Sequence, residues 1–310
     1  MRIVFFGTPE LAIPSLESLI AVYDIVSVVC QPDKPVGRKK KLQAPPVKFW
    51  AEERKIPVVQ PTDLNDGTFE EWLKSQEPDV CALVAYGRLL KQSLLDVPTH
   101  GFINMHPSLL PLYRGPSPIQ TAVLNGDTVT GVSIMKLDSG MDTGDVLMQE
   151  TLPLPLEATS EDMNAQLSAL GADMMLKSLE AIEAGEAYFT PQDESLSTHT
   201  RMFIKQDGAI NWDCTADYLY NQVRASVPWP VAYFRYNEQP MRVHTCAVIE
   251  EIVNEAPGTI IRIEDHQLIV STGKSALAIR VIQAPGKKAM PIADYQHGNP
   301  FTVGTTLENG

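Results

Sequence analysis

The stretch RIVFFGTPELAIPSLESLI, residues 2–20, begins with a continuous apolar run and continues into a segment with helical spacing. The run predicts a buried strand, and Gly7 at its end permits a tight turn. Thr8 is predicted to be the N-cap of the following helix, with Pro9 at its first position. A buried strand followed directly by a helix is the repeating unit of α/β proteins with a parallel sheet.

The same alternation continues through the first half of the chain. Near-continuous apolar strands separated by helices predict a doubly wound, Rossmann-like α/β domain with a mostly parallel sheet. No GxGxxG follows the first strand, which disfavours a nicotinamide-dependent oxidoreductase. The further predicted strands are residues 24–30, 56–61, 79–87 and 101–106, and the helical segments between them are residues 44–55, 67–76 and 89–98.

The second half changes character. A helix at 118–127, a strand pair at 130–138 and 144–154, and a long helix at 159–185 are followed by residues 186–208, which lack clear periodicity. A helix at 211–225 and short alternating segments over 231–286 then predict a small OB-like β-barrel. We therefore expect a catalytic domain at 1–187, a linker at 188–206 and a C-terminal domain at 207–310.

Composition limits the class of protein. With 310 residues and 44% hydrophobic content, the chain can bury the cores of about two soluble domains. No stretch approaches the roughly 18 apolar residues of a membrane helix, and the first apolar run is too short for a signal peptide. Four dispersed cysteines without disulfide or metal spacing fit the cytoplasm. The formal net charge of -13 argues against a surface that binds nucleic acid everywhere.

Asn104 and His106 occur in FINMHP, where a predicted strand ends. Side chains alternate along a strand, so these two lie on one face, at the sheet edge where α/β proteins bind ligands. An amide and an imidazole there can donate hydrogen bonds to an oxygen that gains negative charge. The alternative is that both side chains bond backbone groups near a turn.

The loop DSGMDTGD, residues 138–145, contains Asp138, Asp142 and Asp145. It could bind a divalent cation, although it lacks the ligand pattern of a calcium loop. It could also be a turn in which Asp and Gly serve backbone geometry. In a third interpretation, a carboxylate from this loop lies beside His106 and orients its ring.

A concentrated run of cations lies within QPDKPVGRKKKLQAPPVK, residues 31–48. Prolines at both ends and a central glycine predict a loop. In an acidic protein, a cationic loop fits a phosphate-bearing partner, although a solvated lysine run is the alternative. The cations are Lys34, Arg38, Lys39, Lys40, Lys41 and Lys48.

Five motifs occur in order: FFGTPE, QPDKPVGRKKK, VAYGRLL, INMHPSLLPLYRG and LDSGMDTGD. Together with PWPVAYF and APGKKAM in the C-terminal half, they resemble the methionyl-tRNA formyltransferase family of folate-dependent enzymes. The resemblance implies formyl transfer from 10-formyltetrahydrofolate, as cosubstrate, to the α-amine of initiator methionyl-tRNA. From the sequence itself we expect no metal and no membrane association, and no obligate protein partner is evident.

The resemblance also implies roles for particular residues. Asn104, His106 and Asp142 would be catalytic. The tetrahydrofolate site would include Ser108, Leu109, Leu110 and Pro111, and the acceptor stem of the tRNA would meet Arg38, Lys39, Lys40 and Lys41. The OB-like domain would bind the tRNA further along.

The chemistry follows from these side-chain types. The amine attacks the formyl carbon, Asn104 and His106 stabilise the oxyanion, and Asp142 orients His106 and helps to remove the amine proton. A sugar-nucleotide N-formyltransferase with the same folate site is the first alternative, and the cationic loop and second domain argue against it. A catalytically silent RNA-binding protein is the second, and the presence of all three catalytic residues argues against that.

Overall fold

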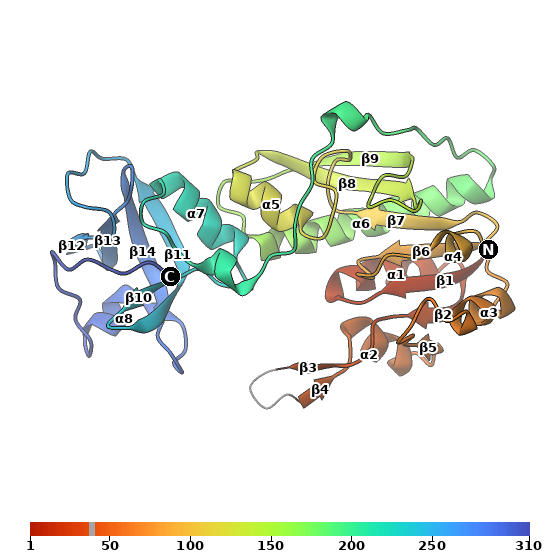
Figure 1. The fold of residues 1–310 in the computed structure, drawn as a ribbon, viewed down its shortest axis with the longest axis horizontal. Helices are drawn as coiled ribbons and strands as arrows, with labels where there is room; N and C mark the ends of the chain where they lie inside the picture. The colour runs from red at the N-terminus through yellow and green to blue at the C-terminus, as the bar shows by residue number, and fades with distance from the viewer. Residues whose placement is uncertain (37–40) are drawn as a thin grey trace. The chain divides into compact units, whose positions relative to one another are not determined.

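The computed structural model describes residues 1–36 and 41–310. The chain divides into two compact units (Figure 1). Unit 1 comprises residues 1–118, 129–153 and 164–201, and unit 2 comprises residues 119–128, 154–163 and 202–310.

Unit 1 is built on a seven-stranded sheet that confirms the predicted doubly wound α/β class. In spatial order its strands are β5 (Val58–Val59), β2 (Asp24–Val29), β1 (Arg2–Gly7), β6 (Val80–Val84), β7 (Phe102–His106), β8 (Val129–Lys136) and β9 (Val146–Pro153). The pairs from β5 to β7 are parallel, whereas β8 and β9 add an antiparallel edge. The chain adds strands on both sides of β1, which is the reversal of strand order near which such folds bind ligands.

Helices α1 to α7 follow the predicted pattern, with boundaries shifted by a few residues, whereas α8 was not predicted. The helices are α1 (Ile13–Ile20), α2 (Pro46–Glu53), α3 (Thr68–Ser75), α4 (Gln92–Leu95), α5 (Pro118–Asn125), α6 (Ser160–Glu183), α7 (Ala216–Ala225) and α8 (Ile292–Gln296), with 3₁₀ turns η1 (Glu10–Ala12), η2 (Glu194–Leu196) and η3 (Lys205–Gly208).

The prediction that Thr8 caps the first helix is wrong. A 3₁₀ turn precedes α1, and Pro9 occupies its N-cap position without a side-chain cap. The Thr8 hydroxyl instead donates to the Tyr86 carbonyl oxygen, at 3.1 Å. Gly7 does serve a close approach, since a Cβ there would lie 2.7 Å from the Phe5 ring and 2.8 Å from Ala12. The Thr8 hydroxyl therefore bonds a carbonyl just beyond the carboxyl end of β6, and not the helix N-terminus that the local sequence predicted.

Strand β7 is buried throughout and directs alternate side chains to opposite faces of the sheet. Phe102 packs in an apolar cluster with Phe6 of β1, Phe69 of α3 and Leu94 of α4. The Phe6 and Phe102 ring centroids are 5.0 Å apart. The alternation therefore places the two polar residues of β7, at positions 104 and 106, on the same face as Phe102.

Unit 2 contains an antiparallel sheet with its own core, in agreement with the predicted small β-barrel. Its strands are β10 (Tyr233–Tyr236), β11 (Gln239–Ile249), β14 (Ala276–Gln283), β13 (Gln267–Ser271) and β12 (Ile260–Glu264), with β15 (Met290–Pro291) beside β14. Near the C-terminus, Thr305 bonds to Ile260 of β12 and Glu308 bonds to Arg235 of β10. The C-terminal segment thus joins the two edges of the sheet.

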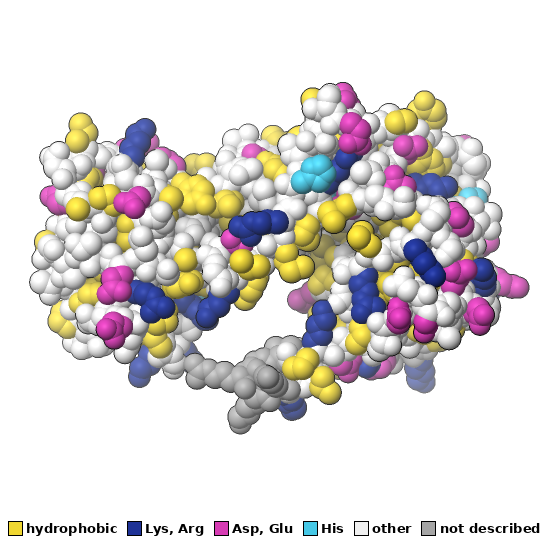
Figure 2. Space-filling model, in the orientation of Figure 1, with side chains coloured by type: hydrophobic (Ala, Val, Ile, Leu, Met, Phe, Trp, Pro, Cys, Tyr) yellow, Lys and Arg dark blue, Asp and Glu magenta, His cyan; other side chains and the backbone are white. Residues whose placement is uncertain are grey.

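The cationic segment contains a short antiparallel pair, where a loop was predicted. Strands β3 (Lys34–Val36) and β4 (Lys41–Gln43) flank residues 37–40, so Arg38, Lys39 and Lys40 lie outside the described residues. Elsewhere, cationic and acidic side chains are interspersed on the face shown in Figure 2. Among the described helices, none combines the length and apolar character needed to cross a membrane.

Candidate active site

Asn104 lies in β7 between Leu83 of β6 and Met135 of β8. The residue is only 5% exposed. Its amide makes no hydrogen bond within residues 1–36 and 41–310. Its amide oxygen and nitrogen are not among the fully buried side-chain atoms that lack a partner, so they keep contact with solvent. The Asn104 amide is therefore available to bind a ligand at the sheet edge.

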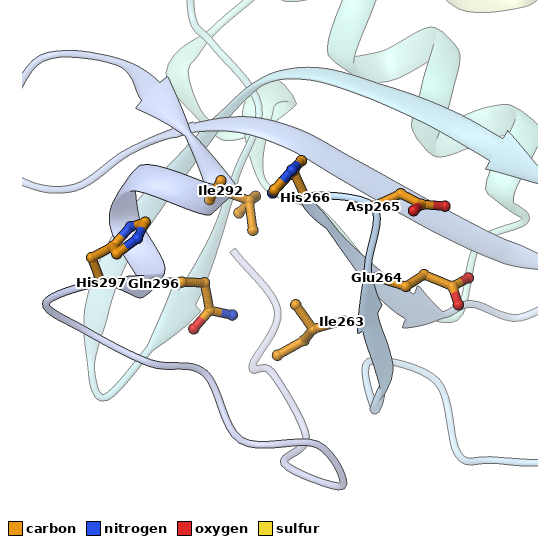
Figure 3. Close-up of a pocket in the computed structure, with 8 residues that line it drawn as sticks. Ile263, Glu264, Asp265, His266, Ile292, Gln296 and His297 are labelled. Atoms are coloured by element: carbon orange, nitrogen blue, oxygen red, sulfur yellow. The ribbon is translucent and has the colours of Figure 1, made fainter.

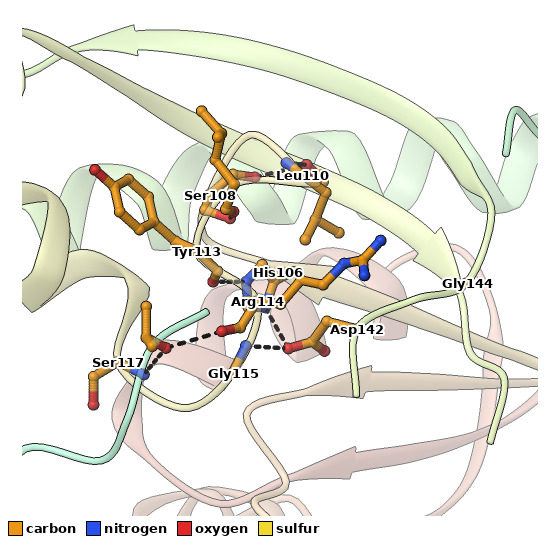
Figure 4. A network of polar contacts seen from close by, with 12 residues as sticks. His106, Ser108, Leu110, Tyr113, Arg114, Gly115, Ser117, Asp142 and Gly144 are labelled. Carbon is orange, nitrogen blue, oxygen red and sulfur yellow. Dashed lines mark hydrogen bonds and ion pairs between the residues drawn. The ribbon is translucent and has the colours of Figure 1, made fainter. Parts of the chain in front are cut away.

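His106, also 5% exposed, ends β7 and has a defined tautomer. Its Nε2 lies 2.9 Å from the Tyr113 carbonyl oxygen (Figure 4). A carbonyl can only accept, so Nε2 carries the hydrogen. The other ring nitrogen, Nδ1, lies 3.6 Å from Oδ2 of Asp142, which is longer than a hydrogen bond. The structure thus brings the loop carboxylate beside the imidazole while leaving Nδ1 able to bond elsewhere.

The three aspartates of the 138–145 loop have different surroundings. Asp142 has a positive φ of 55°, and its Oδ2 accepts a hydrogen bond of 2.8 Å from the Gly115 backbone N–H. Asp138 accepts from the Gly140 N–H and the Thr143 hydroxyl, so it shapes the turn. Asp145 is exposed. In the described residues, no group of three or more potential ligand side chains is arranged to hold a metal.

The 108–111 segment, which the sequence assigns to the folate site, is fixed from β8 and β9. The Ser133 hydroxyl donates to the Ser108 carbonyl at 2.6 Å and accepts from the Leu110 N–H at 3.0 Å. Gln149 donates to the Leu110 carbonyl at 2.7 Å. The Ser108 hydroxyl is itself occupied, because it donates to the Leu112 carbonyl at 2.6 Å. A ligand here would meet a preformed backbone.

One cation of the predicted phosphate-binding group is already paired. Lys48 donates to both carboxylate oxygens of Asp33, at 3.0 and 3.2 Å, and to the Gln60 side chain. Hydrogen bonds from Gln60 and Lys48 lower the pKa of Asp33, and the bond to Asp33 raises the pKa of Lys48. Lys48 therefore anchors the base of the β3–β4 pair, whereas Lys41 is exposed on β4.

Several residues beside Asn104, His106 and Asp142 carry no local sequence signal for their position. Tyr113 and Gly115 bond His106 and Asp142 through backbone atoms, which any residue type possesses. A Cβ at Gly115, where φ is 108°, would lie 2.8 Å from the Thr200 carbonyl oxygen. Gly115 therefore lies close to Thr200, in the segment predicted as a linker, and periodicity could not predict this proximity.

A hollow of about 590 Å³ lies in unit 2 (Figure 3). Ile263, His266, Ile292 and His297 are among its lining residues. It contains none of the residues to which the sequence assigned a catalytic, folate-binding or tRNA-binding role.

Two family models match the chain. The model described as formyl transferase matches residues 1–179, and the model described as the formyl transferase C-terminal domain matches residues 203–300.

Curated relatives match over the full length. A methionyl-tRNA formyltransferase from Syntrophus aciditrophicus is 41% identical over 308 residues, covering 99% of both chains. The one from Moorella thermoacetica is 39% identical, with the same coverage. Among solved structures, an N-formyltransferase from Helicobacter canadensis in complex with folinic acid and dTDP-3-aminofucose has a TM-score of 0.68 and 20% identity, covering 92% of this chain and 99% of that chain. At that identity the likeness shows the fold alone.

Proposed function

Because the chain belongs to the formyl transferase family, we propose that it transfers the formyl group of 10-formyltetrahydrofolate to the α-amine of initiator methionyl-tRNA in the cytoplasm. The observation that carries the proposal is the full-length identity of about 40% to methionyl-tRNA formyltransferases. The juxtaposition of Asn104, His106 and Asp142 supports it from the side of chemistry.

The reaction begins with attack of the neutral amine on the formyl carbon. An ester withdraws electrons, so this amine titrates below the range of about 7.7–8.0 usual for peptide α-amines, and little deprotonation work remains near neutral pH. The attack forms a C–N bond and places negative charge on the formyl oxygen. The Asn104 amide donates to that oxygen. Collapse of the intermediate breaks the bond between the formyl carbon and N10 and releases tetrahydrofolate.

His106 assists from Nδ1 in this scheme, because the Tyr113 carbonyl occupies its Nε2–H. When protonated, Nδ1 can donate to the same oxyanion as Asn104. The Asp142 carboxylate, 3.6 Å away, offsets the charge of the imidazolium. Burial of the ring strengthens both interactions, since the local dielectric is low.

Asp142 accepts the amine proton, directly or through a water. Its Oδ2 is held by the Gly115 N–H, whereas Oδ1 has no hydrogen-bond partner within the described chain. Oδ1 is therefore the free acceptor. The proton then passes to N10 of the departing tetrahydrofolate, so that charge and atoms balance over the turnover.

The two substrates bind to different parts of the chain. The 108–111 segment, with Ser108, Leu109, Leu110 and Pro111, binds the folate. Arg38, Lys39, Lys40 and Lys41 meet the tRNA acceptor stem, and the C-terminal barrel binds further along the tRNA. We assign catalysis to residues 1–187, the connection to 188–206 and the barrel domain to 207–310.

A sugar-nucleotide N-formyltransferase remains the alternative that a specific observation favours. The Helicobacter canadensis structure covers 92% of this chain. The presence of a second domain therefore does not argue against a sugar-nucleotide N-formyltransferase, as the sequence had suggested. The cationic segment at 34–41 is the feature that favours a polyanionic acceptor.

A competition assay tests the choice of acceptor. The protein is incubated with 10-formyltetrahydrofolate and equal concentrations of initiator methionyl-tRNA and a thymidine-diphosphate 3-amino sugar, with elongator methionyl-tRNA in a parallel reaction. We expect formyl on methionine of the initiator tRNA. Formyl on the sugar alone would replace our proposal with the alternative.

A further inference from the structure

Residues 190–200, which sequence reasoning placed in a linker, are bonded to both loops of the active site in unit 1. The segment starts beside β9, where Thr190 and Val146 exchange backbone hydrogen bonds of 2.8 and 2.9 Å. It includes the 3₁₀ turn η2 and then runs next to residues 111–117. We call it the 190–200 segment.

The first contact region is the turn that holds His106. Tyr113 has a positive φ of 60°, a strained conformation for a residue with a side chain. Its N–H donates to the Thr198 hydroxyl at 2.8 Å, while its carbonyl accepts from His106 Nε2 at 2.9 Å. The N–H of Tyr113 thus bonds the 190–200 segment, and its carbonyl bonds the His106 imidazole.

The contacts continue along the same turn. The Arg114 N–H donates to the Thr198 carbonyl at 2.9 Å, and the Thr200 N–H donates to the Arg114 carbonyl at 2.7 Å. The next N–H, from Gly115, holds the Asp142 carboxylate (Figure 4). The backbone that orients two catalytic side chains is therefore paired with the 190–200 segment.

The second contact region is the loop that carries Asp142. Asp142 also has a positive φ, and its carbonyl accepts a 2.9 Å hydrogen bond from the Gln192 amide. The same amide nitrogen donates to the Gly144 carbonyl at 2.7 Å. The Gln192 side-chain oxygen accepts from the Arg114 guanidinium at 2.9 and 3.1 Å. One side chain thereby ties the two loops together.

Arg114 adds an ionic connection. Its side chain is 1% exposed, and its guanidinium makes two parallel hydrogen bonds, of 2.7 and 2.9 Å, to the Glu194 carboxylate. These bonds lower the pKa of Glu194. A buried guanidinium needs such partners, because an unpaired buried charge is strongly destabilising.

We propose that the 190–200 segment is a positioning element of the active site. In this proposal Gln192 and Thr198 are positioning residues that hold the side chains of Asp142 and His106 in place relative to each other. Neither residue touches the reacting atoms; each fixes a backbone in a conformation that it would not keep alone. Displacement of a catalytic group by about 1 Å can cost about 10²-fold in rate. The kinetic part of the proposal rests on the proposed function.

Matched variants separate positioning from folding. Thr198→Val removes the hydroxyl that accepts from Tyr113, and Thr198→Ser keeps it. Gln192→Glu keeps an oxygen for Arg114 but replaces the amide donor to the Asp142 carbonyl. Ser195→Ala is the control, because Ser195 lies in the same segment and bonds only Asp193 in the described structure.

We expect Thr198→Val and Gln192→Glu to lower kcat about tenfold or more, with both KM values changed less than about twofold. Thr198→Ser and Ser195→Ala should keep most of the wild-type rate, and Thr198→Val should match Ser195→Ala in melting temperature. Equal kcat for Thr198→Val and Thr198→Ser would overturn the proposal. So would a rise in KM at unchanged kcat.

A measurement without substrate makes the test independent of the reaction. NMR signals of the His106 ring, assigned by their loss in His106→Gln, should shift in Thr198→Val and stay in place in Ser195→Ala. Unshifted signals in Thr198→Val would contradict positioning even if the activity fell. A wild-type protein that does not formylate methionyl-tRNA would contradict the proposed function, and the ring signals would still decide the role of the segment.

Discussion

The carboxyl end of β7 combines an amide that makes no hydrogen bond to the described residues with an imidazole whose Nε2–H bonds the Tyr113 carbonyl. Asn104 is therefore open to a ligand, whereas His106 is oriented by Tyr113 and has its Nδ1 3.6 Å from Asp142. Their shared face followed from strand alternation. The position of Asp142, 36 residues after His106, could be expected from the family resemblance but not from periodicity, because its approach depends on the fold of β8 and its loop.

Asp142→Asn removes the negative charge beside Nδ1 and the acceptor that we propose for the amine proton. We expect kcat to fall by about 10² or more, in the range typical of lost general acid–base catalysis, with the melting temperature preserved. Asp145→Asn, in the same loop and exposed, is the matched control and should retain activity. Near-normal turnover of Asp142→Asn in a steady-state formylation assay would remove Asp142 from the mechanism.

Burial raises the pKa of the Cys30 thiol to about 11. The native state therefore holds the thiol proton more tightly than the unfolded state, whose cysteine pKa is about 8.5. The resulting stabilisation is complete below pH 8.5 and is lost as the pH rises toward 11. Thermal unfolding between pH 8 and pH 11 should show a smaller fall in melting temperature for Cys30→Ala than for wild type. Cys214→Ala, at a partly buried thiol, is the control, and parallel curves for wild type and Cys30→Ala would refute this linkage.

At the scale of elements, strands and helices could be predicted where local periodicity decided them, as in β1, β7 and α6. Other predictions failed because side chains bond partners that are distant in sequence. Thr8 bonds a carbonyl of the β6 end instead of capping a helix, and Lys48 pairs with Asp33 instead of remaining free for phosphate. The 190–200 segment lacks periodicity because its contacts use backbone groups and single side chains at irregular spacing.

The β3–β4 element carries the predicted tRNA contact of Arg38. Its base is anchored by the Asp33–Lys48 pair, which lies apart from the 108–111 segment in sequence. We expect Arg38→Ala to raise KM for methionyl-tRNA about tenfold or more and to leave KM for 10-formyltetrahydrofolate within about twofold. Lys177→Ala removes one exposed cation from α6 and should change neither value. Equal losses for both substrates would assign the element to the folate site or to the fold.

For the whole molecule, the net charge of -13 repels the polyanionic tRNA that we propose as substrate. Binding then depends on local cations, and each phosphate contact releases condensed counterions. We expect the Kd for tRNA to rise steeply with KCl, and the slope of log Kd against log salt to fall by about 1 in Arg38→Ala. A slope that is flat in wild type, measured by filter binding, would argue against phosphate contacts.

The central claim is that this chain makes formylmethionyl-tRNA at the Asn104, His106 and Asp142 site. The most direct measurement is the mass of the amino acid released from initiator tRNA after incubation with 10-formyltetrahydrofolate carrying a ¹³C-labelled formyl group. We predict labelled N-formylmethionine from the wild-type protein, at a rate about 10² to 10³ lower in Asn104→Leu, which lacks the amide donor. Unmodified methionine from the wild-type reaction, while the Syntrophus aciditrophicus relative formylates the same tRNA sample, would contradict the claim.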